Sequence, residues 1–156
     1  LGANTRIYPH AKPNSLLVTG RAFENESGGL WEMVIEEPIT VKRLATTGPD
    51  QAYVGAAASP DGIVLLQIDD EIDYSLVCYD NSSQNTEVLQ SLDTFATHIR
   101  ANTRGEAWVA TRPHWEQQDV SGGLLVVDIE TCELLNPTPI STGLPPYALD
   151  FIEVVP

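Results

Sequence analysis

Basic side chains and long apolar runs are both scarce in this sequence. Eight Lys and Arg stand against 22 Asp and Glu, which gives a formal net charge of −14 at pH 7. Such a charge repels phosphate backbones and anionic membrane surfaces. The richest apolar stretches, 62–68 and 122–127, have the length of a strand and fall well short of the roughly 20 residues that a membrane-spanning helix needs. We therefore expect no nucleic-acid binding and no membrane insertion.

Metal-binding spacing is also lacking. Neither of the two cysteines, Cys78 and Cys132, belongs to a Cys-x-x-Cys or Cys/His arrangement that would hold zinc. The acidic residues within 69–73 could offer oxygen ligands to Ca²⁺, but they lack the fixed spacing of an EF-hand, so a solvated loop explains them better. No metal motif is formed by the three histidines, His10, His98 and His114. The sequence predicts no metal site and no cofactor.

Short catalytic signatures are missing as well. The chain has no Gly-x-Ser-x-Gly elbow, no His-Glu-x-x-His helix and no Gly-rich phosphate loop. The opening Leu-Gly-Ala-Asn-Thr lacks the charged and apolar regions of a signal peptide, so either none existed or it was removed. Two N-glycosylation patterns begin at Asn25 and Asn81, and they have meaning only in a secretory pathway. These patterns favour a secreted or extracytoplasmic protein.

Short apolar runs fill the chain instead, and they repeat. Intervals rich in Gly, Pro, Asn, Asp and Ser separate them, a pattern typical of an all-β protein. Steps of 43 to 48 residues superpose three turns and the strands that follow them. The superposed turns are 12–15, 59–62 and 102–105, and the superposed later strands begin at Leu30, Leu76 and Leu124. Four strands in each cycle is the pattern of β-propeller blades.

These repeats divide a single domain, 1–156, into three four-stranded antiparallel blades. We expect blade 1 over about 6–45, blade 2 over about 53–91, blade 3 over about 97–137 and an extra innermost strand over about 147–155. A β-sandwich whose hairpins happen to fall into step is the alternative. Three coincident sets of positions argue against it.

The repeats resemble those of a known group of propellers. Ala58-Ser-Pro-Asp-Gly62, the stretch 123–131 and the stretch 142–149 resemble the YVTN-type repeats of YncE-like and surface-layer propellers. The wider lactonase-like and fungal secreted six-bladed propellers are similar. The resemblance implies the architecture and specifies the activity hardly at all. Lactonase-like propellers bind a divalent cation through Glu, Asn and Asp in the channel, and no such set falls on the innermost strands here.

Three blades do not close a ring, because propellers typically have about four to eight. The end blades would expose apolar faces and strand edges. Either two copies associate into a six-bladed ring, or another chain or residues lost to processing complete a larger propeller. In a symmetric dimer, a strand at 147–155 would compete with strand 6–11 of the partner. We therefore favour a partner chain or a swapped terminal strand.

Polar side chains fall on the innermost strands, which line the channel of a propeller. In register, one channel level holds His10, Ala57, Arg100 and Asp150, and another holds Tyr8, Gly55, His98 and Ala148. In a functional interpretation, Arg100 fixes a carboxylate-like group while His98 or His10 acts as an acid or base near neutral pH. In a structural interpretation, these side chains pair across a wet channel and hold the blades together.

The longest loop on the ligand-binding face of such a propeller is 111–122. It holds Arg112, His114 and Trp115, which could contact a ligand or a partner protein. A surface loop with Trp115 packed on a blade edge is the alternative.

Cysteine pairing and tryptophan burial can also be predicted from the register. Cys78 and Cys132 fall one blade apart, which we take as too far for the roughly 4.4–6.8 Å between the Cα atoms of a disulfide. We expect both to be reduced, or Cys132 to be linked to another chain. Trp31 and Trp108 fall on blade strands, where core packing explains them best.

Two functions from different classes fit these observations. The first is a non-catalytic scaffold module that binds a small molecule or a protein through its loop face and channel, using Arg112, His114, Trp115, His98, Arg100, His10 and Asp150. The second is a lactonase-like or fungal cyclase-like enzyme that acts on a small organic molecule, with His98 and Arg100 as catalytic candidates. The lack of a metal set favours the first, and the polar channel residues favour the second. The sequence leaves open whether the protein is an enzyme.

Overall fold

The structure is a computed structural model that describes residues 5–20, 28–69, 73–113 and 122–152. These residues contain strands and turns but no helix, and therefore none long and apolar enough to cross a membrane. In chain order the strands are β1 (Arg6–Pro9), β2 (Ser15–Gly20), β3 (Gly29–Val34), β4 (Thr40–Thr46), β5 (Ala52–Ala58), β6 (Gly62–Asp69), β7 (Asp73–Asp80), β8 (Thr86–Leu92), β9 (Thr94–Ala101), β10 (Glu106–Pro113), β11 (Gly123–Asp128) and β12 (Glu133–Leu134).

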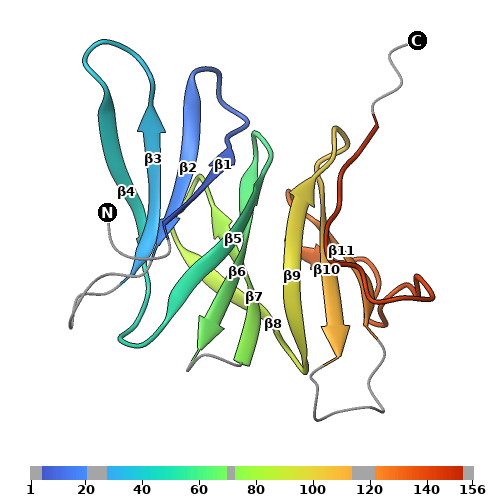
Figure 1. Cartoon of the computed structure of the whole chain (residues 1–156). Coiled ribbons are helices and arrows are strands. Elements are labelled where there is room, and N and C mark those ends of the chain that lie inside the picture. Colours follow the sequence, from blue (N-terminus) through green and yellow to red (C-terminus); the bar gives the residue numbers. More distant parts are fainter. Residues whose placement is uncertain (1–4, 21–27, 70–72, 114–121, 153–156) are drawn as a thin grey trace.

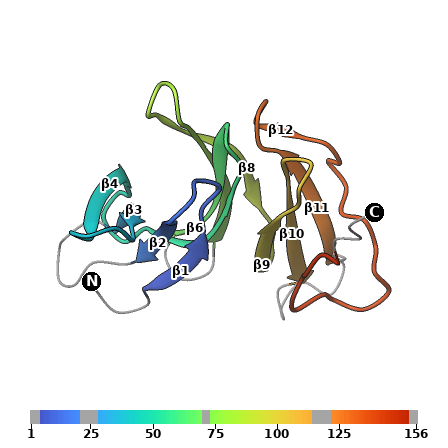
Figure 2. The ribbon, with the colours of Figure 1, turned by 90° about the horizontal axis from the view of Figure 1, so that it is seen from above.

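The strands form three sheets that follow one another in chain order (Figures 1 and 2). The first sheet has the order β1-β2-β3-β4, the second β5-β6-β7-β8 and the third β9-β10-β11-β12, and every neighbouring pair is antiparallel. The innermost strands lie together, because β5 contacts both β1 and β9. These sheets confirm an all-β fold of three four-stranded antiparallel units.

The middle sheet is apolar on both faces because it packs between the other two. Alternate side chains of a strand point to opposite faces of its sheet. In β6, Ile63 and Leu65 pack with Leu17 of the first sheet. Val64 and Leu66 of the same strand join the cluster shared with the third sheet. The continuous apolar run of β6 is therefore the pattern of a strand that is buried on both faces.

Bulges recur at equivalent positions in different sheets. The ladder shifts register at Leu30 in the first sheet and at Leu76 in the second. A second pair of bulges leaves Val54 of β5 and Thr97 of β9 without a partner on the next strand. Because a bulge places one extra residue in a strand and bends it, these matched irregularities support the register of the sequence repeats.

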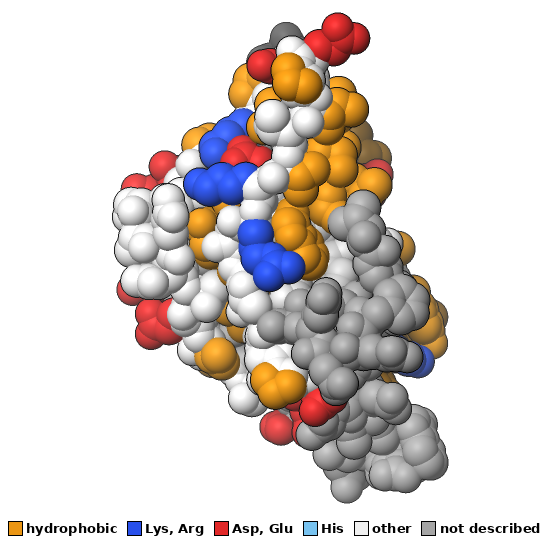
Figure 3. All heavy atoms as spheres, turned by 90° about the vertical axis from the view of Figure 1, so that its left-hand side faces the viewer, with side chains coloured by type: hydrophobic (Ala, Val, Ile, Leu, Met, Phe, Trp, Pro, Cys, Tyr) orange, Lys and Arg blue, Asp and Glu red, His pale blue; other side chains and the backbone are white. Residues whose placement is uncertain are grey.

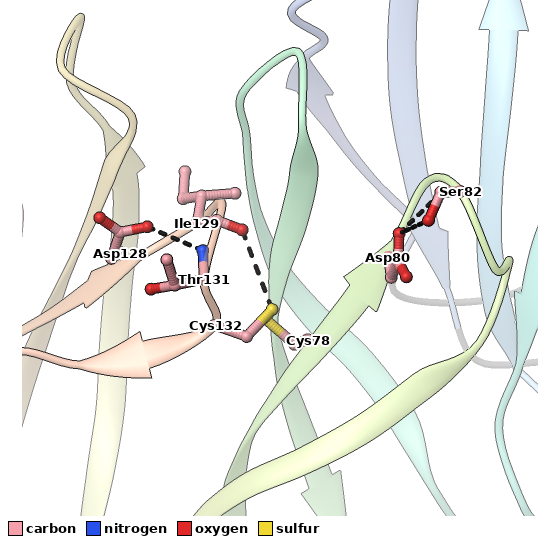
Figure 4. Close-up of a disulfide and its surroundings, with 7 residues drawn as sticks. All are labelled: Cys78, Asp80, Ser82, Asp128, Ile129, Thr131 and Cys132. Carbon is pink, nitrogen blue, oxygen red and sulfur yellow. Dashed lines mark hydrogen bonds between the residues drawn. A yellow bond between two sulfur atoms is a disulfide. The ribbon is translucent and has the colours of Figure 1, made fainter.

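Cys78 and Cys132 form a disulfide, so both expectations, that the two are reduced or that Cys132 is linked to another chain, are wrong (Figure 4). Their Cα atoms are 6.1 Å apart. Neighbouring blades pack face to face. Residues at equivalent positions of two neighbouring blades can therefore come into contact. The turn after β11 bends over the second sheet, buries Ile129 between the two sheets and places Cys132 beside β7. Such a bond is typical of proteins from oxidising compartments.

Residues 147–152 form no strand, which corrects the predicted innermost strand over 147–155; residues 153–156 lie outside the described part of the chain. This segment lies against the third sheet instead. Thr97 Oγ1 donates a hydrogen bond to the carbonyl of Pro146 at 2.9 Å, and the ring of Phe151 meets that of Trp108 edge-on at 5.9 Å. A strand needs a neighbour for its backbone N–H and C=O groups, and residues 147–152 join none of the three sheets.

The outermost strand of the third sheet is shorter than the 133–137 expected from the repeats. β12 pairs with β11 over two residues, and the chain then leaves the sheet before Ile140 returns to pair with Leu124. Asn136 bridges the gap, because its side chain accepts from Val126 N–H at 2.6 Å and donates to the Leu124 carbonyl at 2.8 Å. Two prolines in 137–139 explain the interruption, since proline has no N–H to donate.

The outward faces of the first and third sheets have no further sheet packed on them among the described residues. Trp31 and Trp108 lie on these faces and are half-buried, outside the two buried clusters of the described residues. On the first sheet, Ile7 is 61% exposed and Val41 is 55% exposed. Figure 3 shows hydrophobic side chains exposed on the side of the molecule that carries β3 and β4, with basic side chains among them.

Candidate functional site

The inner wall of the molecule consists of β1, β5 and β9, one strand from each sheet. The bulge at Val54 determines how the first two sheets join. The carbonyl of Val54 accepts hydrogen bonds from Arg6 Nη1 at 2.9 Å and from the Tyr8 hydroxyl at 2.7 Å. Side chains of β1 therefore bind the backbone of β5. These hydrogen bonds hold the two inner strands in position relative to each other.

One end of the inner wall opens into a cavity of about 650 Å³. The cavity lies where the three inner strands end and the following turns begin. Its lining includes His10, Ala57 and Arg100, which the repeats placed at one level. Asp150, predicted for the same level, is not part of the described lining. The structure thus brings three of these four residues together.

His10 is held inside its own hairpin. Its Nδ1 accepts the N–H of Lys12 at 2.9 Å, and its Nε2 lies 3.9 Å from a carboxylate oxygen of Glu32. Lys12 Nζ binds the same oxygen at 2.9 Å. Burial lowers the pKa of His10 below its usual value, while Glu32 acts to raise it and Lys12 to lower it. A neutral imidazole in these surroundings supports the structural interpretation of His10.

His98 occupies the second level, beside Tyr8 and Gly55, at a small cavity of about 30 Å³. Burial lowers its pKa most, the positive charge of Arg100 lowers it further, and Asp150 acts in the opposite direction. Its Nε2 is buried and has no hydrogen-bond partner. Because the usual pKa of histidine is about 6.5, this imidazole is neutral at pH 7 and is able to exchange a proton with a ligand.

Arg112 lies near the end of β10, over two aromatic rings. Its guanidinium carbon is 4.9 Å from the ring centre of Phe95 and 5.8 Å from that of Tyr147. Its Nε is buried and has no hydrogen-bond partner. The other two predicted loop residues, His114 and Trp115, lie outside the described residues.

The aromatic neighbours of Arg112 were missed in the sequence. Tyr74 meets Phe95 edge-on, with ring centres 5.9 Å apart and planes at 83°. Tyr74 and Phe95 stand at the starts of β7 and β9, whereas Arg112 stands at the end of β10. Antiparallel neighbours place these strand ends on one side of the sheets. Sorting the aromatic residues by strand end would have grouped them, although it would not have added Tyr147.

Three arginines beside the cavities, Arg6 on β1, Arg100 on β9 and Arg112 on β10, have no carboxylate partner among the described residues. The ion pairs of those residues join Lys12 to Glu32 and Arg104 to Glu106, and the neutral His10 lies 3.9 Å from Glu32. None of these pairs involves Arg6, Arg100 or Arg112. The Nε atoms of Arg100 and Arg112 are also buried without a hydrogen-bond partner. In a chain with 22 acidic residues, unpaired guanidinium groups beside cavities are suited to bind an anion.

Comparison with known proteins adds information on the fold. No protein-family model matches the sequence, and no curated protein matches it. A solved structure described as oligogalacturonate lyase in complex with manganese matches with a TM-score of 0.54 and 10% identity, over 82% of this chain and 34% of that chain. That protein is a β-propeller. The present fold is part of a propeller.

The propeller counterpart is much longer than this chain, which spans about a third of it (34%). An identity of 10% shows the fold alone. In propeller terms, the three sheets are blades and the inner wall faces the channel. Within the described ranges, no group of three or more His, Cys, Asp or Glu side chains is placed to hold a metal ion.

Proposed function

We propose that this propeller segment is a non-catalytic binding module that recognises a small anionic ligand on its inner wall. Arg100 on that wall and Arg112 on the neighbouring strand β10 carry the proposal, because neither has an ion-pair partner among the described residues. A buried donor without an acceptor is unfavourable, and a carboxylate or phosphate oxygen would supply the acceptor that Arg100 and Arg112 lack.

Arg100 and His98 are suited to act together in such binding. They lie two residues apart on β9, so their side chains leave the same face of the strand. Arg100 would pair with the negative charge of the ligand, and the neutral imidazole of His98 would accept or donate one hydrogen bond. Asp150 contributes a negative charge near His98, which would disfavour anions that carry excess charge.

Isothermal titration calorimetry with citrate, benzoate and inorganic phosphate, and with neutral glycerol as the comparison, tests this function. We expect at least one anion to bind the unmodified chain and to bind at least about tenfold more weakly to an Arg100→Gln/Arg112→Gln double variant. Lys42→Gln is the matched control, because Lys42 is exposed on the outermost strand β4. Equal binding of glycerol, or no anion binding at all, would refute the proposal.

A lactonase-like or fungal cyclase-like enzyme is the second candidate, and the state of His98 favours it. A neutral imidazole with a buried, unpartnered Nε2 beside Arg100 has the protonation state that a general base needs. The structural counterpart is described with manganese, but the described residues of this chain do not fit such a site because no cluster of metal-ligating side chains exists among them. If the chain is an enzyme, His98→Gln should keep ligand binding and abolish turnover of a lactone substrate.

We also propose that a second copy of this chain completes the ring. Three blades leave the outward faces of the first and third sheets without a neighbouring blade, and a propeller typically needs about four to eight. A strand at 147–155 would have competed with the partner's first strand in a symmetric dimer. Residues 147–152 form no strand, so this objection to a symmetric dimer does not apply. Another propeller chain, or residues beyond this sequence, would replace the second copy if the chain stays monomeric.

Secretion is the localisation that fits best. The Cys78–Cys132 disulfide and the sequence patterns at Asn25 and Asn81 support it. Asn81 lies in the turn between β7 and β8, where its side chain donates to the Pro60 carbonyl at 3.2 Å. Mass spectrometry before and after glycosidase treatment of chain secreted from a eukaryotic host would show whether the patterns are used.

A further inference from the structure

A second cleft lies at the end of the inner wall opposite the His10 cavity. Its volume is about 520 Å³, within the roughly 300–1,000 Å³ typical of small-molecule sites. Small and aliphatic residues of β5 and β6 form its floor. We call it the aromatic cleft, after the side chains that line the rest of it: Arg6, Tyr53, Tyr74, Phe95, Ala96, Thr97, Arg112 and Tyr147.

Arg112 is prepared in this cleft to bind an anion. Its contacts with Phe95 and Tyr147 are cation–π contacts, which use the faces of the rings and leave the N–H donors of the guanidinium available. Its Nε–H has no acceptor. A guanidinium presents its donors as a planar fork that matches the two oxygens of a carboxylate. The aromatic contacts hold this fork before any ligand arrives.

Charge in the aromatic cleft is opposite in sign to that of the whole chain. Two arginines line it, and the described lining includes no Asp or Glu. Arg6 uses Nη1 to bind the Val54 carbonyl, which fixes its position on β1. The cleft is therefore locally positive on a chain whose net charge is −14. A negatively charged ligand is favoured there, and a cation is excluded.

The aromatic part of the lining favours a flat ring. Tyr74 and Phe95 meet edge-on, and aromatic side chains favour stacked or edge-on contact with other rings. A sugar acid would bring several hydroxyl groups, each of which needs a partner once it is buried. The described lining contains no Asn, Gln, Asp or Glu, so the polar side-chain groups there are two guanidinium groups, the hydroxyls of Tyr53, Tyr74 and Tyr147, and that of Thr97. The Thr97 hydroxyl already donates within the chain, to Ala110 O or Pro146 O. An aromatic ring fits these walls better than a sugar does.

We propose that the aromatic cleft binds an aromatic carboxylate of the benzoate type. The carboxylate pairs with the fork of Arg112, the ring lies against Tyr74 and Phe95, and Arg6 contributes a second positive charge. This inference rests on the proposed function, since it names the ligand class and the place on the inner wall where the anion binds. Tyr147 belongs to the terminal segment, so that segment forms one wall of the site.

Calorimetric titration of the full chain with four probes tests the inference. Benzoate is the expected ligand, benzamide lacks its charge, cyclohexanecarboxylate lacks its flat ring, and galacturonate is a sugar acid. We expect benzoate to bind most tightly and to lose at least about tenfold in affinity in Arg112→Gln. Lys42→Gln should bind as the unmodified chain does.

A second variant separates binding from folding. Tyr147 is 68% exposed and lies outside any strand, so Tyr147→Ala should leave the thermal unfolding temperature unchanged while weakening benzoate binding a few-fold. Benzoate binding that depends on Arg100 and not on Arg112 would overturn the inference and keep the proposed function. Tighter binding of galacturonate or cyclohexanecarboxylate would overturn the ligand class. No binding of any of the three acids would overturn the inference, and with failure of citrate and phosphate the proposed function as well.

Discussion

The hydroxyl of Tyr8 donates a hydrogen bond to the carbonyl of Val54 at 2.7 Å, across the boundary between the first two blades. Val54 is the residue that the β5–β6 ladder skips. The bulge in the second sheet thereby supplies a hydrogen-bond acceptor to a side chain of the first sheet. Hydrogen bonds from side chains to the backbone therefore join the first two blades, in addition to apolar packing. Polar groups on the inner wall thus help to stabilise the boundary between these blades.

Replacing Tyr8 by Phe should therefore weaken this boundary. The variant keeps the ring and removes the donor, so the loss should be about 0.5–1.5 kcal/mol of unfolding free energy. In a protein of this size that corresponds to a fall of roughly 2–4 °C in the unfolding temperature per kcal/mol. Tyr147→Phe is the control, because Tyr147 is largely exposed. Equal unfolding temperatures for Tyr8→Phe and the unmodified chain would contradict the proposed role of the bond.

Gly55, the one glycine on β1, β5 or β9, should tolerate no side chain. A Cβ atom there would lie 2.8 Å from Leu66 Cδ1 and 2.9 Å from Ile99 Cγ2. Gly55→Ala should then cost roughly 1–3 kcal/mol through overpacking between the second and third blades. Gly20→Ala should be neutral or slightly stabilising, because its nearest contact would be 3.4 Å. Urea unfolding should show a clear loss of stability for Gly55→Ala and none for Gly20→Ala, and a stabilised Gly55→Ala would show that the blades are loosely packed there.

The repeats predicted the blades because each repeat contains turn residues followed by a run of apolar residues, the local pattern of a buried strand. Turns with Gly or Asn at their ends and a continuous apolar run such as 63–66 are local signals that can be read from the sequence. The bulges at Leu30 and Leu76 fall at superposed positions for the same reason. The terminal strand failed because strand formation there depends on a neighbouring edge, and no local pattern reports whether that edge exists.

The disulfide should account for a large share of the stability. It closes a loop between residues that are 54 apart in sequence, for which loop-closure entropy gives an upper value of about 4 kcal/mol. A Cys78→Ala/Cys132→Ala double variant should therefore unfold at lower urea than the oxidised chain, by about 2–4 kcal/mol. Reduction of the unmodified chain should give the same loss. Two thiols that react in the folded, unreduced chain would contradict the bond.

Parts of the site could be predicted and parts could not. His10, Ala57 and Arg100 were grouped because innermost strands share a register, which depends only on the repeat. The aromatic cleft was missed because Arg112 lies on β10 and Tyr147 on an irregular segment, so no single strand register connects them. The disulfide was missed because a repeat gives the order of blades and not the distance between their facing turns.

Acid should destabilise the fold through His98. Its pKa is lowered in the folded chain, so below about pH 6.5, the usual value, the unfolded chain binds more protons than the folded one. The stability that the neutral imidazole contributes is present above that pH and is lost as the pH falls toward the lowered pKa. Asp80 does not interfere, because hydrogen bonds from Ser82 lower its pKa to about 2.

The check is the urea midpoint of the unmodified chain and of His98→Gln between pH 8 and pH 5. The difference between the two proteins isolates His98 from the other charges that face it, which are Arg100 on its own strand, Arg6 on β1 and Asp150 in the terminal segment. We expect the midpoint of the unmodified chain to fall more steeply with acid than that of the variant. A steeper fall in the variant would reverse the assigned direction.

Ring closure by a second copy depends on the open face of the first blade. Ile7 and Val41 are more than half exposed on it, so Ile7→Lys/Val41→Lys should leave the single chain folded. In a closed ring the same lysines would be buried against the partner without an acceptor, which is strongly unfavourable. The unmodified chain should therefore sediment at twice the 17.0 kDa of one chain, and the double variant at the mass of one.

Val88→Lys provides the matched control for this prediction. Val88 is 56% exposed on β8, the outermost strand of the middle blade, both faces of which are already covered by the other two. A lysine there meets no partner in a six-bladed ring, so the variant should keep the mass of the unmodified protein. If the unmodified chain sediments as a stable monomer across the concentration range, the second copy is not what covers the open faces, and the blades that complete the ring must come from a different chain or from outside this sequence.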